Sequence, residues 1–93
     1  MAEINTESII ERREGVVFNK LDDELVMMSI ANGEYYGLDS IGTRIWEIIE
    51  KETSVANIIQ ILCDEYDVNP EQCNIDTMSF LNILLEKKLS NIV

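Results

Sequence analysis

The part of the chain that decides the fold is the sequence LVMMSIANGEYYGL, residues 25–38. Residues 25–31 alternate with the two-residue period of a strand, and the second face is only half polar, which favours a central position in a sheet. The apolar face carries Val26, Met28 and Ile30. Asn32-Gly33 then favours a two-residue type I′ turn, because both residues tolerate a positive φ. Residues 34–38 are predicted to be the returning strand of an antiparallel hairpin.

The segments on either side of this hairpin complete the predicted fold. Val16–Lys20 is β-branched and aromatic, and a turn at residues 21–24 separates it from the hairpin, so it adds a further strand. After residue 38 the apolar residues recur with the 3.6-residue period of a helix. Three helices are expected to begin at Asp39 or Ser40, at Thr53-Ser54 and at Asn69-Pro70. The predicted fold class is α+β: a three-stranded antiparallel sheet followed by a three-helix bundle, in the order βββααα.

The length of 93 residues is that of one small domain. Residues 1–14 are polar with scattered isoleucines, and we expect them to form a loosely packed N-terminal lead to a single domain at residues 15–93. The longest apolar run, residues 25–28, is far shorter than the ~20 residues that span a membrane. Residues 1–7 lack the apolar core of a secretory signal. We therefore expect a cytoplasmic protein without a membrane partner.

The charge balance restricts the function. There are 18 acidic and 7 basic side chains and no histidine, for a net charge of −11. Nucleic acids are unsuitable partners, because their phosphates are bound by basic side chains. Without histidine, Cys63 and Cys73 lack a partner for a nucleophile or a zinc site, and the four glycines lack a phosphate-binding spacing. We therefore predict a protein that is not an enzyme and has no cofactor and no metal.

The last predicted helix is apolar over more than half of its circumference, wider than a core stripe of ~100°. Its apolar positions are Cys73, Ile75, Met78, Phe80, Leu81, Ile83, Leu84 and Leu85. Either the helix is sandwiched inside the core, or one flank is covered by something other than this chain.

The third predicted strand is a candidate binding edge. Residues 34–38 contain neither lysine nor proline, with which natural sheets protect their edges. Tyr35 and Tyr36 combine apolar rings with polar tips, a composition favoured at binding surfaces. An extended peptide could pair with this edge and direct alternate side chains toward the last helix. The alternative is that the two tyrosines pack in the core.

The energetics of such pairing require an apolar groove. Backbone hydrogen bonds of about 0.5–1.5 kcal/mol each are largely offset by the ordering of the peptide. Micromolar affinity needs about 8 kcal/mol. The remainder must come from buried apolar side chains of the peptide.

Several motifs resemble the pyrroloquinoline quinone biosynthesis protein D (PqqD) family. The sequence GEYYGLDSIGTRIWE, residues 33–47, resembles the family segment G-x-Y-Y-x-L-N/D-x-x-G-x-x-I-W. Residues 53–58 resemble the family's T-V-x-x-I helix start, residues 64–68 its tyrosine-aspartate-valine turn, and residues 76–81 its D-x-x-x-F-L segment. The resemblance covers about residues 15–89.

The resemblance implies a winged-helix-like recognition element for ribosomally made, post-translationally modified peptides (RiPPs). Such a protein binds the leader segment of a precursor peptide without catalysis and presents it to a modifying enzyme, which is a leader peptidase, a cyclase or a radical-SAM enzyme. A stand-alone lasso-peptide protein is one form. The leader adds a strand to the third β-strand beside the third helix. The implied strand residues are Glu34, Tyr35, Tyr36, Gly37 and Leu38. The implied helix residues are Asp76, Phe80 and Ile83, or Met78 on the other flank.

Two other functions remain open at this point. A winged helix could bind DNA, but the third helix offers only Lys87 and Lys88, both at its far end. A homodimer could form if the open edge and the apolar flank paired with a second copy. Sedimentation separates a dimer from a peptide-binding monomer.

Overall fold

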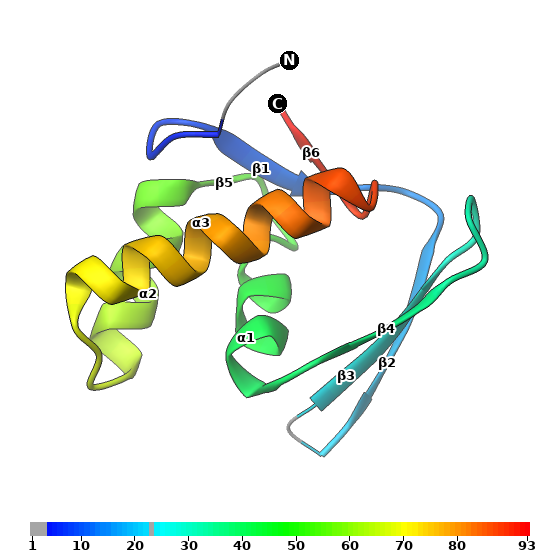
Figure 1. The fold of residues 1–93 in the computed structure, drawn as a ribbon, viewed down its shortest axis with the longest axis horizontal. Coiled ribbons are helices and arrows are strands. Elements are labelled where there is room, and N and C mark those ends of the chain that lie inside the picture. Colours follow the sequence, from blue (N-terminus) through cyan, green and yellow to red (C-terminus); the bar gives the residue numbers. More distant parts are fainter. Residues whose placement is uncertain (1–3, 23) are drawn as a thin grey trace.

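The computed structural model describes residues 4–22 and 24–93, and it contains two small antiparallel sheets and three helices (Figure 1). The elements are, in chain order, β1 (Ile9–Arg12), β2 (Val16–Leu21), β3 (Glu24–Ser29), β4 (Tyr35–Leu38), α1 (Ser40–Ile48), β5 (Thr53–Ser54), α2 (Val55–Glu65), α3 (Pro70–Glu86) and β6 (Ser90–Ile92). One sheet has the strand order β2-β3-β4 and the other β5-β1-β6. The α+β class is therefore confirmed. The order βββααα omits β1, β5 and β6, and the winged-helix likeness stays a prediction.

The sheet β2-β3-β4 is the predicted meander. β3 lies in the centre, as its two largely apolar faces predict. Pairing runs from Val16↔Ser29 to Leu21↔Glu24 on one side, and from Met28↔Tyr35 to Leu25↔Leu38 on the other. The side chains of β3 that enter the core are Leu25, Met27 and Ser29. In the predicted turn at residues 21–24, Asp22 has a φ of 57°, and Asp23 lies outside the described residues.

The predicted type I′ turn at Asn32-Gly33 is wrong. Gly33 has a φ of 71°, whereas Asn32 does not have a positive φ. The Gly33 N–H donates to the Ser29 carbonyl at 2.7 Å, and the Ser29 N–H donates to the Glu34 carbonyl at 3.1 Å, so four residues separate the paired ends. The side chain of Asn32 accepts a hydrogen bond from the Glu34 N–H at 2.9 Å. This local bond favours a longer loop, because an Asn side chain can take the place of a backbone acceptor.

The loose packing expected for residues 1–14 is wrong where the structure describes them. Ile10 is fully buried, and Ile4 is only 9% exposed. β1 pairs on one side with β5 and on the other with β6. The N-terminal segment therefore belongs to the core, and it does not lie along the edge of β4.

The three helices begin at predicted caps. Asp39 accepts a hydrogen bond from the Gly42 N–H at 2.8 Å, Ser54 accepts from Asn57, and Asn69 accepts from Glu71 and Gln72. Such side chains satisfy N–H groups that have no partner within the helix. Within the described residues, no helix is both long and apolar enough to span a membrane.

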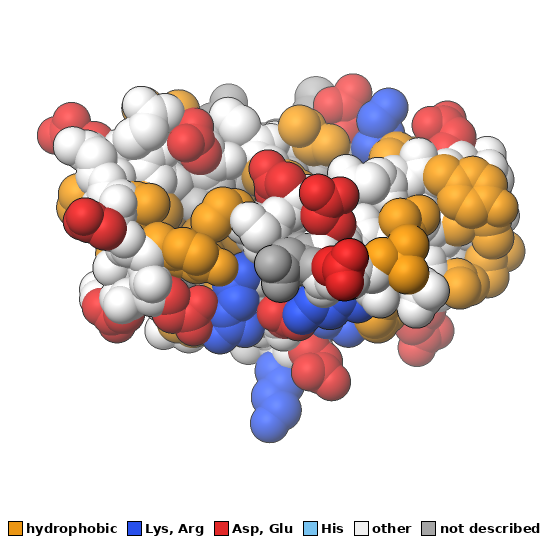
Figure 2. Space-filling view, turned by 90° about the horizontal axis from the view of Figure 1, so that it is seen from below, with side chains coloured by type: hydrophobic (Ala, Val, Ile, Leu, Met, Phe, Trp, Pro, Cys, Tyr) orange, Lys and Arg blue, Asp and Glu red, His pale blue; other side chains and the backbone are white. Residues whose placement is uncertain are grey.

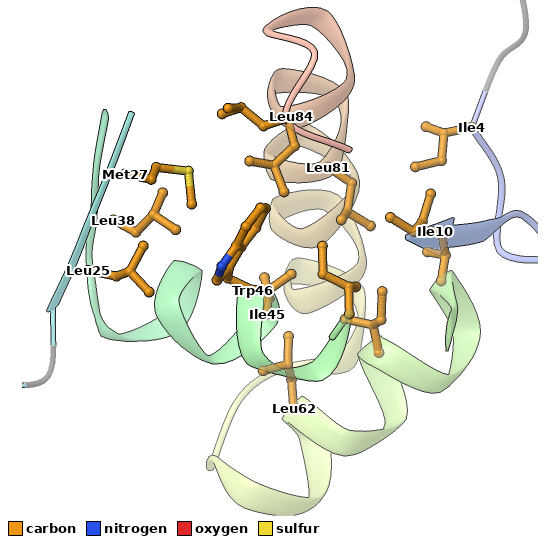
Figure 3. Packing of buried hydrophobic residues seen from close by; sticks show 14 of the residues in the cluster. Ile4, Ile10, Leu25, Met27, Leu38, Ile45, Trp46, Leu62, Leu81 and Leu84 are labelled. Atoms are coloured by element: carbon orange, nitrogen blue, oxygen red, sulfur yellow. The ribbon is translucent and has the colours of Figure 1, made fainter. Parts of the chain in front are cut away.

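The core lies where α1 and α3 face both sheets. Trp46 of α1 lies at its centre, between Met27 and Leu38 of the first sheet and the leucines of α3, and Ile10 of β1 closes the far side (Figure 3). A single core therefore holds the two sheets and the helices together.

Arg12 of β1 joins the second sheet to α1. Its guanidinium donates to the Trp46 carbonyl at 2.9 Å and 2.6 Å. The same group lies 4.7 Å from the centroid of the Trp46 ring and 5.0 Å from that of Phe18 on β2. Burial lowers the pKa of Arg12 from its ordinary value, with the carboxylates of Glu47 and Glu50 acting in the opposite direction. Cation–π contacts and two hydrogen bonds therefore fix the position of β1 against the first sheet.

Candidate functional site

The outer edge of β4 is free of any strand among the described residues. The Ser29 N–H bonds to the Glu34 carbonyl in the register of the β3–β4 pair. Hydrogen-bonded and non-hydrogen-bonded pairs alternate in an antiparallel sheet, so Tyr36 and Leu38 direct their backbone groups at β3. Tyr35 and Gly37 therefore direct their N–H and C=O groups away from the sheet, where an added strand could bind them.

The side chains of β4 alternate between the core and solvent. Leu38 is buried and Tyr36 is half-buried against the core, whereas Tyr35 is 73% exposed on the opposite face. The Tyr36 hydroxyl donates to the Glu34 carboxylate at 3.2 Å and accepts from the Asn32 amide at 3.3 Å. The alternative of a tyrosine pair in the core thus holds in part for Tyr36 and not for Tyr35.

A cavity of about 440 Å³ lies where β4 ends and α1 begins, against the first half of α3 and the end of α2. Its lining is mainly apolar and consists of Asp39, Ile41, Gly42, Ile45, Leu62, Tyr66, Val68, Asn69, Gln72, Cys73, Asp76, Thr77 and Phe80. Seen from below, the end of the molecule formed by α2 and α3 shows apolar side chains surrounded by acidic ones (Figure 2). We call this cavity the groove.

One flank of α3 forms a wall of the groove. Asp76 and Phe80 line it, and the Phe80 ring packs so closely on Gly42 that a Cβ there would lie 3.1 Å from Cε1 of Phe80. Ile83 follows at the spacing i, i+4, i+7 that places residues on one helix face, and it is 51% exposed. Met78 lies apart from this flank and packs against the core. The structure therefore brings Asp76 and Phe80 to the end of β4, with Ile83 continuing their flank.

The sandwich interpretation of α3 is wrong. The helix buries Cys73, Thr77, Leu81 and Leu84. Ile75 and Ile83, however, are 60% and 51% exposed. Part of the wide apolar circumference is therefore left uncovered by the described residues.

The opposite wall of the groove was missed in the sequence. It comes from Ile41 in the first turn of α1 and from Tyr66 and Val68 after α2. Ile41 and Val68 are each more than a third exposed. Val68 could have indicated this wall, because it is an apolar residue in the short connection between two helices and belongs to the apolar stripe of neither helix.

The charges of the groove are acidic. Asp39 and Asp76 are its charged lining residues. The Asp39 carboxylate caps α1, and that of Asp76 accepts from the Gln72 side chain at 2.9 Å. Next to the groove, Arg44 forms two hydrogen bonds of 2.7 Å with Glu65, which lower the pKa of that carboxyl. The groove thus suits an apolar ligand with hydrogen-bond donors or positive charge at its ends.

The groove has no feature of a metal centre. Among the described residues, no three side chains of the ligating types gather closely enough to hold a metal ion. Burial raises the pKa of the Cys63 thiol, with a further contribution from its hydrogen bond to Cys73. A thiol with a raised pKa is a poor nucleophile at neutral pH.

Comparisons with known proteins give a family and several similar structures. The family of coenzyme PQQ synthesis protein D (PqqD) matches residues 24–89. The chain is similar to TbiB1, in a structure with the TbiA(beta) leader peptide, at 33% identity and a TM-score of 0.81, over 87% of this chain and 94% of that chain. No curated protein matches the chain significantly.

Two further solved structures share the fold at lower identity. One is a lasso peptide synthetase B1 complexed with the leader peptide, with 22% identity and a TM-score of 0.77 over 88% of this chain and 96% of that chain. The other is the PqqD part of Methylobacterium extorquens PqqCD, described as a stand-alone RiPP recognition element, with 19% identity and a TM-score of 0.78 over 95% of this chain and 94% of that chain.

Proposed function

Since this chain belongs to the PqqD family, we propose that it binds the leader segment of a ribosomally made precursor peptide, without catalysis, by strand addition to β4. The observation that carries this proposal is the free edge of β4 next to an apolar groove. The complex of TbiB1 with a leader peptide, at 33% identity, supports the same ligand class.

The edge of β4 gives the peptide its direction and register. Tyr35 and Gly37 offer two N–H and two C=O groups, enough for up to four backbone hydrogen bonds. At about 0.5–1.5 kcal/mol each, these bonds are mostly offset by the cost of ordering the peptide. The edge therefore selects an extended backbone of almost any sequence.

The groove supplies the sequence preference. Phe80, Ile41 and Val68 present an apolar surface, and burial of a large apolar side chain contributes about 1.5–3 kcal/mol. Two such side chains would bring the binding free energy closer to the value of about 8 kcal/mol that micromolar affinity requires. Asp39 and Asp76 would accept hydrogen bonds or a positive charge from the peptide.

The partner that follows is the enzyme that modifies the bound precursor. We infer a protein of the lasso-peptide type, because two of the three similar structures carry leader peptides and one of these is a lasso peptide synthetase B1. A leader peptidase, a cyclase or a radical-SAM enzyme would then act on the presented peptide. A cytoplasmic location suits this function, because the precursor is made on the ribosome.

Substitution of Gly37 by proline tests the proposal directly. Gly37→Pro removes an N–H that points away from the sheet, so β3–β4 pairing keeps its own hydrogen bonds. We expect the affinity for a synthetic leader of the cognate precursor, measured by isothermal titration, to fall at least about tenfold. Melting followed by circular dichroism should show that the variant is folded.

Gly37→Ala is the matched control. It keeps the N–H, and an added Cβ meets no atom within 4 Å, so leader affinity should equal that of the unmodified chain. Equal affinities for the alanine and proline variants would contradict strand addition at β4. A tight dimer in sedimentation that the leader neither disrupts nor joins would favour homodimerisation instead.

A further inference from the structure

The face of the β2-β3-β4 sheet that points away from α1 is largely apolar, and none of the described residues covers it. Its apolar residues, which we call the outer face, are Val17, Leu21, Val26, Met28 and Tyr35, with Ile30 directly after β3. Asn19 of β2 lies on the same side. Val17, Met28 and Tyr35 lie in register across the three strands. Figure 2 shows apolar side chains gathered at the end of the molecule that this sheet forms, at the right of the view.

Such a face is unusual for a sheet exposed to water. Antiparallel sheets with one solvated face normally alternate apolar and polar residues. Here 27% of all residues are charged, yet Glu24 is the one charged residue of β2, β3 and β4 that points to this side. The opposite face already supplies the core through Leu25, Met27 and Leu38. A contiguous apolar patch that the chain does not need for its own core is typical of an interaction surface.

We propose that the outer face docks the enzyme that modifies the bound precursor, an inference that rests on the proposed leader-binding function. A leader added along β4 extends the sheet by one strand. Its alternate side chains then point to the same side as Tyr35. Gly37 has no side chain, and an added Cβ would meet no atom within 4 Å, so nothing at this position stands between the outer face and the peptide. A protein seated on the outer face would therefore contact this chain and every second leader residue at the same time.

The rim of the outer face indicates the charge of this partner. Asp22 and Glu24 lie at one end of the sheet and Glu34 at the other, all exposed. The lysine of β2, Lys20, points to the inner side and is paired with Glu47 at 3.1 Å. An enzyme surface with an apolar centre and a basic rim is therefore complementary. A second copy is not, because any face-to-face arrangement would bring two acidic rims together between chains of net charge −11.

The test uses a double variant on β2, the strand farthest from the leader edge. Val17→Glu/Leu21→Glu places two charges in the outer face at side chains that are 55% and 59% exposed. The probe is the modifying enzyme that processes the same precursor, in purified form. We expect its affinity for the double variant, measured by biolayer interferometry with and without leader, to fall at least about tenfold. Leader affinity should stay within about twofold of the unmodified chain, because β2 lies two strands away.

Ile75→Glu is the matched control. It introduces one negative charge, as the single Val17→Glu variant does, at a similarly exposed isoleucine on α3 outside the outer face, and enzyme affinity should not change. If the double variant is unfolded by circular dichroism, the single Val17→Glu variant takes its place.

Three outcomes would overturn the docking surface. They are enzyme affinity that is unchanged in a folded double variant, no enzyme binding by the unmodified chain, and a dimer of the unmodified chain that the double variant dissociates. Failure of the leader to bind would instead overturn the proposed function. The two failures are distinguishable, because enzyme binding is also measured without leader.

Discussion

The two sheets of the molecule differ in what they leave open. The sheet β5-β1-β6 is built from strands of two to four residues, and its central strand buries Ile10 completely. The sheet β2-β3-β4 is built from one continuous segment, and within residues 4–22 and 24–93 nothing pairs with the edge of β4 or covers the outer face. The sheet β5-β1-β6 therefore closes the fold, whereas the sheet β2-β3-β4 leaves an edge and a face that the described residues do not cover. Substitutions in the first should change stability, and substitutions near the second should change binding.

The largest expected effect is a loss of stability from a substitution in the sheet β5-β1-β6. Ile10→Ala should lower the free energy of unfolding by about 2–5 kcal/mol, because it leaves a cavity at a fully buried position. Urea denaturation gives this value. Ile9→Ala, at the half-buried neighbour, is the control and should cost less. A loss for Ile10→Ala below about 1 kcal/mol would mean that β1 is not part of the core.

Removal of the Arg12 contacts that connect the two sheets should have the next largest effect on stability. Arg12→Ala deletes two hydrogen bonds to the Trp46 carbonyl and the contacts with two rings. We expect a loss of about 1–3 kcal/mol in unfolding free energy. The fluorescence of the single tryptophan should shift as well, since Arg12 contacts its ring. Arg13→Ala changes an exposed arginine next to it and should leave both measurements unchanged.

Two truncations test which flank of α3 lines the proposed leader site. Phe80→Ala removes a wall of the groove and should weaken leader binding about tenfold, which is 1.4 kcal/mol. Met78→Ala truncates the other flank, so leader affinity should change little. Titration calorimetry on both variants decides between the flanks. A larger loss of affinity for Met78→Ala would place the leader on the far side of the helix.

The smallest effect concerns a surface ion pair beside the groove. Hydrogen bonds from Arg44 hold the pKa of Glu65 below its ordinary value of 4.5. A depressed carboxyl pKa contributes stability above the unfolded pKa, and this contribution is lost as the pH falls through the folded pKa. Glu65→Gln should therefore be slightly less stable than the unmodified chain at pH 7 and equal to it in strong acid. Glu52→Gln, at another exposed carboxylate, serves as the control, and a difference that does not depend on pH would contradict this cause.

What the sequence predicted well is local in the chain. The meander β2-β3-β4 and the caps Asp39, Ser54 and Asn69 rest on residues within a few positions of one another. In the turn at Asn32, by contrast, a single side-chain hydrogen bond to Glu34 selects a longer loop. Two conformations open to the same dipeptide differ by too little for the residue types to decide between them.

What the sequence did not predict depends on distant contacts. β1 pairs Ile10 with Thr53 on one side and with Ile92 on the other, and segments of two to four residues carry almost no periodic signal. The candidate site shows the same division. The strand residues 34–38 and one flank of α3 were predicted, whereas Ile41 and Val68 were missed, because only tertiary packing brings them to the groove.

The pairing of β1 with β6 has a consequence for how this domain can be joined to other proteins. The Val93 N–H donates to the Ile9 carbonyl at 2.8 Å, so the strands nearest to both ends of the chain lie side by side, on the other sheet from β4 (Figure 1). A linker attached at either end would leave the ligand edge unobstructed. A domain of this shape could therefore be inserted into a loop of a larger enzyme, because its two connections to that enzyme would lie close together.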